Sequence, residues 1–206
     1  MRSNGSRQHE AKSYAGNSRS LNQAARVPLR WRLVSSSQQH TDRLGQAIGS
    51  SLRGGETIAL YGPLGAGKTA LVRGIARGLG AESTAVTSPT FVMIHEYQGR
   101  LPLAHVDLYR VRSPRDLEST GLVDYFSGST VTAVEWADKG TPVLPSDRLD
   151  IELTHRAVQS RVIRLRATGP VSGELLSHAK VHYGAGGPKQ TTARQRTAAR
   201  KGRARL

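Results

Sequence analysis

Residues 62–69 read GPLGAGKT and match the pattern GxxxxGK[ST] of a phosphate-binding loop. The five residues before the loop, TIALY at 57–61, are apolar and β-prone, and residues 70–79 carry apolar side chains at helical spacing. The pattern therefore predicts a strand, a loop and a helix in succession. In such a loop, glycines let the backbone come close to a ligand, so that N–H groups and the helix N-terminus point at phosphate oxygens. The alternative is a glycine-rich turn that matches by chance, and the flanking strand and helix argue against it.

The loop predicts a nucleoside-triphosphate enzyme. Lys68 supplies a compact cation for the β and γ phosphates, and Thr69 supplies a hydroxyl for Mg²⁺. No [NT]KxD motif follows, so we do not expect specificity for guanine. The residues expected to contact the nucleotide in this part of the chain are Gly62, Pro63, Leu64, Gly65, Ala66, Gly67, Lys68, Thr69 and Ala70.

Length and composition limit the other possibilities. A chain of 206 residues suits one α/β domain plus tails. The chain contains no cysteine, which excludes disulfides, zinc–thiolate sites and thiol catalysis. Its longest apolar runs are far shorter than the roughly 20 residues that span a bilayer, and residues 1–30 hold no apolar core of a signal peptide. We therefore expect a cytoplasmic protein without a membrane partner.

The net charge of +15 is concentrated at the two ends of the chain. Residues 1–32 contain seven Arg or Lys against Glu10 alone, and residues 184–206 contain seven against no acidic residue. Residues 33–183 are nearly neutral, with 16 basic and 14 acidic residues. Both ends are poor in large apolar residues and cannot offset the entropy of ordering. The sequence therefore predicts a disordered basic extension at 1–32, a P-loop ATPase domain at 33–183 and a disordered basic tail at 184–206.

Each basic end has two interpretations. The C-terminal tail either binds RNA phosphates or is a solubilising segment without a specific partner, because basic tails attract polyanions without sequence preference. The N-terminal segment is rich in Arg and Ser and poor in acid, and it resembles either an organellar transit peptide or a bacterial-type extension.

The pattern within residues 33–183 predicts further helices and strands. Residues 41–52 place apolar side chains on one face, which indicates a helix with Thr41 as a possible N-cap. Residues 91–97 and 101–108 are β-prone and flank a Gly-containing turn at 98–100, which is typical of a hairpin and makes the sheet mixed. The other expected elements are strands at 130–136, 149–153 and 161–166 and a short helix at 114–119.

Two acidic residues end apolar runs of the expected sheet. Asp107 follows LAHV and Glu135 follows VTAV. In open α/β sheets the ligand lies at the carboxyl ends of the strands, so these carboxylates are candidates to reach Mg²⁺ and the attacking water. The alternative for each is a solvated residue where a strand turns. The hydroxyl-rich residues 87–90, TSPT, predict a nucleotide-sensing segment, and the alternative is a turn that starts the hairpin.

Six segments occur in the order typical of one family. They are GPLGAGKT at 62, TSPTF at 87, HVDLYR at 105, GLVDYF at 121, VEW at 134 and LPSDRLDIEL at 144. Over residues 33–180 the chain thereby resembles TsaE, the ATPase component of bacterial tRNA threonylcarbamoyladenosine (t6A) synthesis. The resemblance implies a P-loop NTPase-like three-layer α/β/α sandwich with a mixed sheet. It also implies ATP hydrolysis that supports TsaD and TsaB, which transfer threonylcarbamoyl to the adenosine beside the anticodon of tRNA.

The resemblance also implies roles for single residues. Lys68, Asp107 and Glu135 form the expected catalytic set, in which Lys68 binds phosphate and Asp107 acts on the catalytic water or the metal's outer shell. Thr69 and Glu135 would bind Mg²⁺. Ser88 and Thr90 would lie in the switch-like segment, Trp136 would lie beside the nucleotide, and Tyr109 and Arg110 match the pattern without an assigned role. Pro63 departs from the acidic residue that is frequent at this loop position, and proline lacks an N–H.

Two alternative functions belong to other classes. A small-molecule kinase would use the same loop with an acceptor site and a lid of clustered arginines, for which Arg110, Arg112 and Arg115 are candidates. A nucleotide-dependent RNA-binding adaptor would use the basic tails, with tRNA as its partner.

Overall fold

The computed structural model describes residues 29–82, 86–89 and 93–185. Both predicted disordered ends, apart from residues 29–32 and 184–185, and the candidate Thr90 lie outside the described residues. The elements, in chain order, are β1 (Arg30–Ser35), α1 (Gln38–Ser51), β2 (Thr57–Tyr61), α2 (Lys68–Gly78), β3 (Ile94–Tyr97), β4 (Leu103–Asp107), α3 (Pro114–Ser119), the 3-10 helix η2 (Leu122–Phe126), β5 (Val131–Glu135), the 3-10 helix η3 (Ala137–Gly140), β6 (Leu149–Ala157), β7 (Ser160–Ala167) and α4 (Pro170–Ala185).

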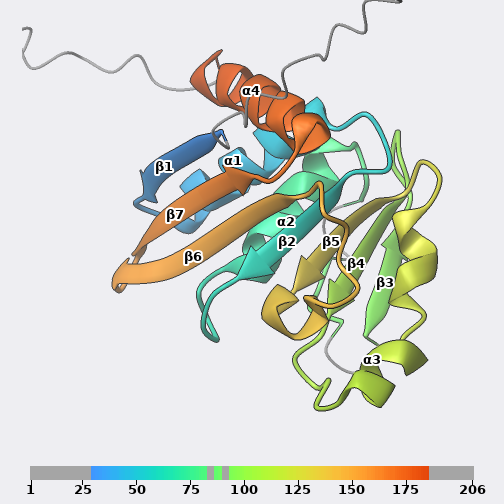
Figure 1. The fold of residues 1–206 in the computed structure, drawn as a ribbon. Coiled ribbons are helices and arrows are strands. Elements are labelled where there is room, and N and C mark those ends of the chain that lie inside the picture. The colour runs from blue at the N-terminus through green and yellow to red at the C-terminus, as the bar shows by residue number, and fades with distance from the viewer. Residues whose placement is uncertain (1–28, 83–85, 90–92, 186–206) are drawn as a thin grey trace, which may run out of the picture.

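The strands form one sheet in the order β1-β7-β6-β2-β5-β4-β3 (Figure 1). Its centre is parallel, since β2 pairs in parallel with both β6 and β5, and β5 pairs in parallel with β4. The outer pairs β6–β7, β7–β1 and β4–β3 are antiparallel. The predicted mixed sheet and its hairpin are confirmed. As a consequence of the parallel centre, the carboxyl ends of β2, β4 and β5 meet at one edge of the sheet.

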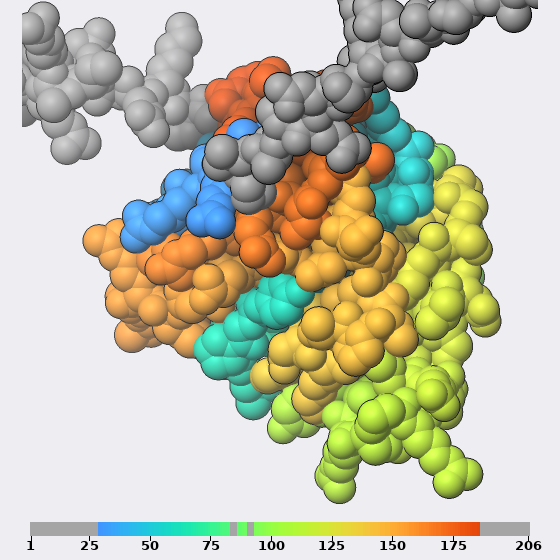
Figure 2. All heavy atoms as spheres, viewed as in Figure 1, coloured from blue at the N-terminus to red at the C-terminus, as the bar shows by residue number. Residues whose placement is uncertain are grey.

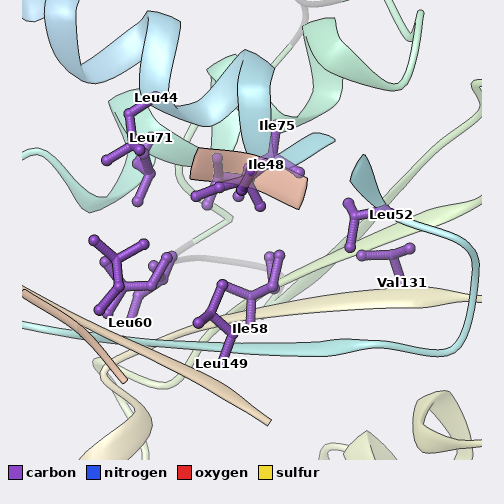
Figure 3. Close-up of a cluster of buried hydrophobic side chains, with 14 of the residues drawn as sticks. Leu44, Ile48, Leu52, Ile58, Leu60, Leu71, Ile75, Val131 and Leu149 are labelled. Atoms are coloured by element: carbon purple, nitrogen blue, oxygen red, sulfur yellow. The ribbon is translucent and has the colours of Figure 1, made fainter. Parts of the chain in front are cut away.

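Helices α1, α2 and α4 cover one face of the sheet and bury the larger apolar core. Apolar residues of α1 and α2 at spacings of three and four point at alternate residues of the central strands, as Figure 3 shows. Alternation along β2 sends Ile58 and Leu60 into this core and Ala59 to the opposite face. Fully buried members of the core include Leu44, Ile48, Leu60, Leu71, Ile75, Leu149 and Leu176.

Short helices cover part of the other face. Residues of α3, η2 and η3 pack with the outward residues of β2, β4 and β5 around a second buried cluster, whose members include Ala59, Val106, Leu108, Leu117, Leu122, Val134 and Ala137. These layers make the α/β/α sandwich that the sequence predicts. Over β1, β7 and β6 the described chain places no helix on this face, and the strands are visible there in Figure 2. The sandwich is therefore complete only over one half of the sheet.

The predicted elements are confirmed with small shifts, except for one cap. The strand at 57–61 and the helix at 114–119 have the predicted bounds. Helix α1 begins earlier than predicted because Ser37 caps it, with its side chain accepting the His40 N–H at 3.2 Å. The prediction that Thr41 is the N-cap is wrong. Thr41 lies buried within α1, and its Oγ1 is 2.8 Å from the Ser35 Oγ.

Strand β1 and helix α4 were not anticipated from the sequence pattern. The boundary predicted at residue 33 falls inside β1, because Arg30, Trp31 and Arg32 pair with β7. The Trp31 ring meets the Tyr183 ring of α4 edge-on at 5.3 Å, so both new elements pack together at the same edge of the fold. Within the described ranges, no helix combines the length and apolar character that crossing a membrane requires.

Candidate nucleotide-binding site

The loop between β2 and α2 surrounds the N-terminus of α2. Gly62 and Gly67 take φ values of 138° and 104°, a backbone region that residues with a side chain rarely adopt. A Cβ on Gly62 would also lie 2.3 Å from the Leu153 carbonyl oxygen. Gly67 is the N-cap residue of α2, so the first N–H groups of the helix open toward the loop. The loop thus offers backbone donors and the positive end of a helix to an anion.

Lys68 is the first residue of α2 and is only 5% exposed. Its Nζ donates to the carbonyl oxygens of Gly62 and Pro63 at 2.7 and 3.1 Å, and it lies 3.7 Å from the centroid of the Trp136 ring. Burial lowers the pKa of Lys68 from its usual value, while three nearby carboxylates act in the opposite direction. The ammonium therefore lies at the centre of the loop, held by acceptors that a phosphate can replace.

Glu135 links the end of β5 to the start of α2. Its Oε1 accepts a hydrogen bond from the Thr69 Oγ1 at 2.8 Å and lies 2.8 Å from the Nε2 of His105. Glu135 is 3% exposed and His105 is fully buried. A hydroxyl and a carboxylate oxygen, the donor types that Mg²⁺ prefers, thus meet directly beside the loop.

Asp107 ends β4 opposite Glu135 in the parallel register of β4 and β5. The Ser88 hydroxyl donates to its Oδ2 at 2.5 Å, and the Tyr109 N–H donates to its Oδ1 at 2.9 Å. Asp107 itself is 2% exposed. Both oxygens of this carboxylate are therefore oriented by neighbours, and one of these neighbours belongs to the predicted nucleotide-sensing segment.

Trp136 follows Glu135 and has a left-handed backbone, with φ 57°. This conformation turns the chain from β5 into η3, where Trp136 is the N-cap residue. The ring packs on the Tyr109 ring with centroids 5.1 Å apart, and its face receives the Lys68 ammonium. The two aromatic rings thereby form a wall next to the lysine.

A groove of about 860 Å³ lies beside the loop. Its lining comes from the loop and α2, from the start of α1, and from the turn between β6 and β7. Residues that line it include Ser37, Asp42, Gly65, Gly67, Ala70, Arg73, Arg77 and Arg161. The groove has room for the part of a ligand that extends away from phosphates bound in the loop.

The structure gathers most of the predicted site residues in one place. Lys68, Thr69, Asp107 and Glu135 converge at the start of α2, and Ser88 and Trp136 touch members of this group. The structure also places the other predicted positions of the loop. Pro63 and Leu64 are exposed, Ala66 is buried, and Ala70 lies in the first turn of α2.

Sequence reasoning assigned no role to two residues of the site, although both lie in the segment HVDLYR. His105 is hydrogen-bonded to Glu135, and Tyr109 contributes its N–H to Asp107 and its ring to Trp136. A signal for His105 exists in the sequence. It is a polar residue inside an apolar strand and stands two positions before Asp107, which places both side chains on the same face.

A glycine-rich loop, a lysine and a threonine at the start of a helix, and acidic residues at the ends of adjacent strands define the class of P-loop nucleotide-binding proteins. The comparison with known protein families then identifies the family within this class. Residues 35–163 match the family described as threonylcarbamoyl adenosine biosynthesis protein TsaE. The chain belongs to the TsaE family.

Individual relatives agree with this assignment. The chain is 39% identical over 132 residues to the tRNA threonylcarbamoyladenosine biosynthesis protein TsaE of Treponema pallidum, covering 64% of this chain and 97% of the relative. It is 39% identical over 142 residues to the Bacillus subtilis protein of the same name, covering 68% and 87%. The crystal structure of Bacillus subtilis YdiB superposes with a TM-score of 0.64 at 31% identity, covering 76% of this chain and 97% of that one.

Proposed function

We propose that this chain is a Mg²⁺-dependent ATPase required for t6A formation on tRNA, acting in the cytoplasm with TsaD and TsaB. The observation that carries the proposal is the convergence of Lys68 and Thr69 with the two strand-end carboxylates at the phosphate-binding loop. Membership of the TsaE family supports the role in tRNA modification, and the geometry of the site supports ATP hydrolysis.

The residues present fit a magnesium ion. In the described part of the chain there is no cluster of three or more His, Asp or Glu that would make an all-protein metal cage. Mg²⁺ in nucleotide sites is instead held by one or two protein oxygens, phosphate oxygens and water. Thr69 Oγ1 and Glu135 Oε1, 2.8 Å apart, supply such oxygens, and the bound ion would neutralise charge that develops on the phosphates.

Lys68 makes the main side-chain contact with the phosphates of ATP. In the structure its ammonium is bound to two loop carbonyls and to the face of Trp136. With ATP in the loop, phosphate oxygens replace the carbonyls as acceptors, and the loop N–H groups bind the same phosphates. These donors stabilise the charge of the transition state without a covalent enzyme intermediate.

Asp107 positions the attacking water. Ser88 and the Tyr109 N–H fix both of its oxygens, so the carboxylate has a defined direction in which to accept a proton from water. The groove beside the loop takes the nucleoside end of ATP, with the side chains of α1 and α2 along it. Ser88 thereby gives the segment at 87–89 a direct connection to the water-positioning group.

Reconstitution of t6A formation tests the proposal. TsaD, TsaB, tRNA, a threonylcarbamoyl donor and ATP are combined with the wild-type chain, with Lys68→Ala, or with the exposed α3 control Arg115→Ala, and both t6A and phosphate release are measured. We expect t6A and ATP hydrolysis with the wild type and the control, and a loss of both of about 100-fold or more with Lys68→Ala. Transfer of labelled phosphate to a small molecule would instead identify a kinase. Full t6A yield with Lys68→Ala would contradict the proposal.

A further inference from the structure

The half of the sheet that no described helix covers carries a regular array of arginines. On the open face of β1 and β7, Arg30 stands directly opposite Arg166, and Arg32 stands opposite Arg164. All four side chains are exposed. Like charges on directly opposed strand positions destabilise a sheet, so the array costs stability unless an anion lies against it.

Carboxylates balance only part of this charge. Asp150 of β6 accepts hydrogen bonds from Arg148 at 2.9 Å and from Arg166 at 2.6 Å, and Glu152 accepts one from Arg164 at 3.2 Å. Within the described ranges, neither arginine of β1 forms an ion pair with a carboxylate. The face therefore has an excess of positive charge, and the excess is concentrated on β1.

The same face is hollowed. A groove of about 800 Å³ runs across it, with Arg30 and Arg32 on one side and Tyr61 and Glu152 toward the other. In Figure 2 this region is the part of the visible surface formed by β1, β7 and β6. Two residues along a strand span about 7 Å, so the four arginines form two opposed pairs about 7 Å apart, which suits a ligand with several charges better than a single small anion.

Both ends of the described chain lie next to β1. Lys180 of α4 donates to the Arg30 carbonyl oxygen at 3.1 Å, and Tyr183 packs on Trp31, so the end of α4 lies next to β1. The sequence before residue 29 carries five basic residues and one acidic residue, and the sequence after residue 185 carries seven basic residues and none that is acidic. Both segments join the domain at the edge where the unbalanced arginines lie.

We propose that the open face of β1, β7 and β6 binds the phosphate backbone of tRNA through Arg30, Arg32, Arg164 and Arg166. Arginine binds phosphate in a planar, bidentate manner, and A-form RNA is recognised largely through its backbone and shape. The surface is separate from the ATP site, and only the choice of tRNA among nucleic acids rests on the proposed function. An acidic protein segment is the competing occupant that the experiment separates.

The test measures binding of fluorescently labelled tRNA to the full chain by anisotropy at several salt concentrations. The variant Arg30→Gln/Arg32→Gln removes two charges and breaks no ion pair of the described residues. The matched control Arg112→Gln/Arg115→Gln removes two exposed charges elsewhere and likewise breaks no ion pair of the described residues. A second variant, Val34→Glu, adds a carboxylate to the same face at a position that is 36% exposed.

We expect the β1 double variant to bind tRNA about fivefold or more weakly at low salt, with a log–log salt slope shallower by about 1 to 2. Val34→Glu should also weaken binding, and the control should stay within about twofold of wild type. Unchanged affinity and slope in both β1 variants would overturn the proposal. If the double variant bound tRNA like the wild type but lost binding to polyglutamate, the face would be a binding site for an acidic protein segment.

The same preparations separate this surface from the proposed ATPase. Hydrolysis measured without tRNA should be equal in wild type, the β1 variants and the control, because none of the substituted residues lies at the loop. A wild type that hydrolyses no ATP would refute the proposed function and leave the tRNA result standing. Normal hydrolysis with unchanged tRNA binding in the β1 variants would refute only the proposed tRNA-binding surface.

Discussion

Gly45 of α1 faces Gly74 of α2 so closely that a Cβ added to Gly45 would lie 2.8 Å from the Gly74 Cα and 2.4 Å from the Leu71 carbonyl oxygen. One turn further along, Gly49 faces Gly78 in the same way, with an added Cβ 3.0 Å from the Gly78 Cα. The two helices therefore touch backbone to backbone. Since α2 begins at Lys68, this contact fixes the helix whose N-terminus forms the phosphate site.

Gly45→Ala should destabilise the fold by about 1 to 3 kcal/mol, because the new methyl group meets backbone atoms that cannot rotate away. The matched control is Gly173→Ala in α4, where an added Cβ meets nothing within 4 Å. The control should be neutral or up to about 1 kcal/mol more stable, as alanine favours helix. Urea unfolding measures both, and equal stability of the two variants would contradict the close packing.

Glu135→Gln should reduce ATP hydrolysis by about 100- to 1000-fold, because it removes the negative charge beside Thr69 while an oxygen acceptor remains. The amide can keep the hydrogen bonds with Thr69 and His105, so the melting temperature should change little. Steady-state phosphate release and thermal unfolding are measured together, with the exposed Glu118→Gln as control. Hydrolysis at the wild-type rate would exclude the metal role of Glu135.

Ser88→Ala should lower kcat about tenfold and leave the KM for ATP nearly unchanged, since Ser88 orients Asp107 and need not bind the nucleotide itself. Ser119→Ala, an exposed serine at the end of α3, is the control. Steady-state kinetics over a range of ATP concentrations gives both constants. A large rise in KM with an unchanged kcat would instead place Ser88 among the nucleotide-binding residues.

The sequence predicts the centre of this fold far better than its edge. The strand at 57–61, the loop and the acids at 107 and 135 follow from short-range patterns, and the structure places them as expected. Strand β1 was missed because its arginines resemble the basic segment before it, although their alternation with Trp31 and Leu33 has the period of a half-buried strand. Its partner β7 lies more than 120 residues later in the sequence.

Within the site, the types of residue could be predicted and their contacts could not. The position of Glu135 at a strand end is a local property, whereas its hydrogen bond with His105 depends on the register of β4 against β5. Likewise, the tilted packing of Tyr109 against Trp136 depends on the left-handed backbone at residue 136. Such contacts arise from tertiary packing, on which sequence spacing carries no information.

Trp136 should report nucleotide binding by fluorescence. The Lys68 ammonium lies 3.7 Å from the centre of its ring, and it should leave this position when phosphate oxygens become its acceptors. The emission of the wild type should therefore change on addition of ATP. The change should persist in Trp31→Phe, whose ring packs against α4, and vanish in Trp136→Phe. A signal that depends on Trp31 instead would contradict the assignment.

Asp147 should stabilise α4 in a pH-dependent manner. Its carboxylate accepts the N–H groups of Val171 and Ser172 at 2.8 and 3.0 Å. Desolvation raises the pKa of Asp147, but hydrogen bonding from the Ser172 side chain and from these two N–H groups outweighs it and holds the pKa below its usual value. A lowered folded-state pKa gives stability that is present above the unfolded-state pKa and is lost as pH falls through the folded one.

Asp147→Ala should therefore cost about 1 kcal/mol at pH 7, as the loss of a helix cap does, and much less near pH 3. Thermal unfolding at both pH values measures the difference from wild type, with Glu118→Ala as a control that should cost little at either. A cost that is equal at both pH values would show that the carboxylate charge plays no part.

The pairing of β1 with β7 has a consequence for biosynthesis. Arg30 is among the first described residues, yet its partner Arg166 follows it by more than 130 positions. During translation the parallel centre of the sheet can assemble while β1 still lacks its neighbour, since β7 emerges from the ribosome last among the strands. Of all the paired strands in the described sheet, β1 and β7 are the furthest apart in the sequence, and contacts between such distant residues form slowly. Folding of this edge is thus a late step, and until β7 has emerged the nascent chain carries an unpaired segment at β1 that includes the apolar residues Trp31, Leu33 and Val34.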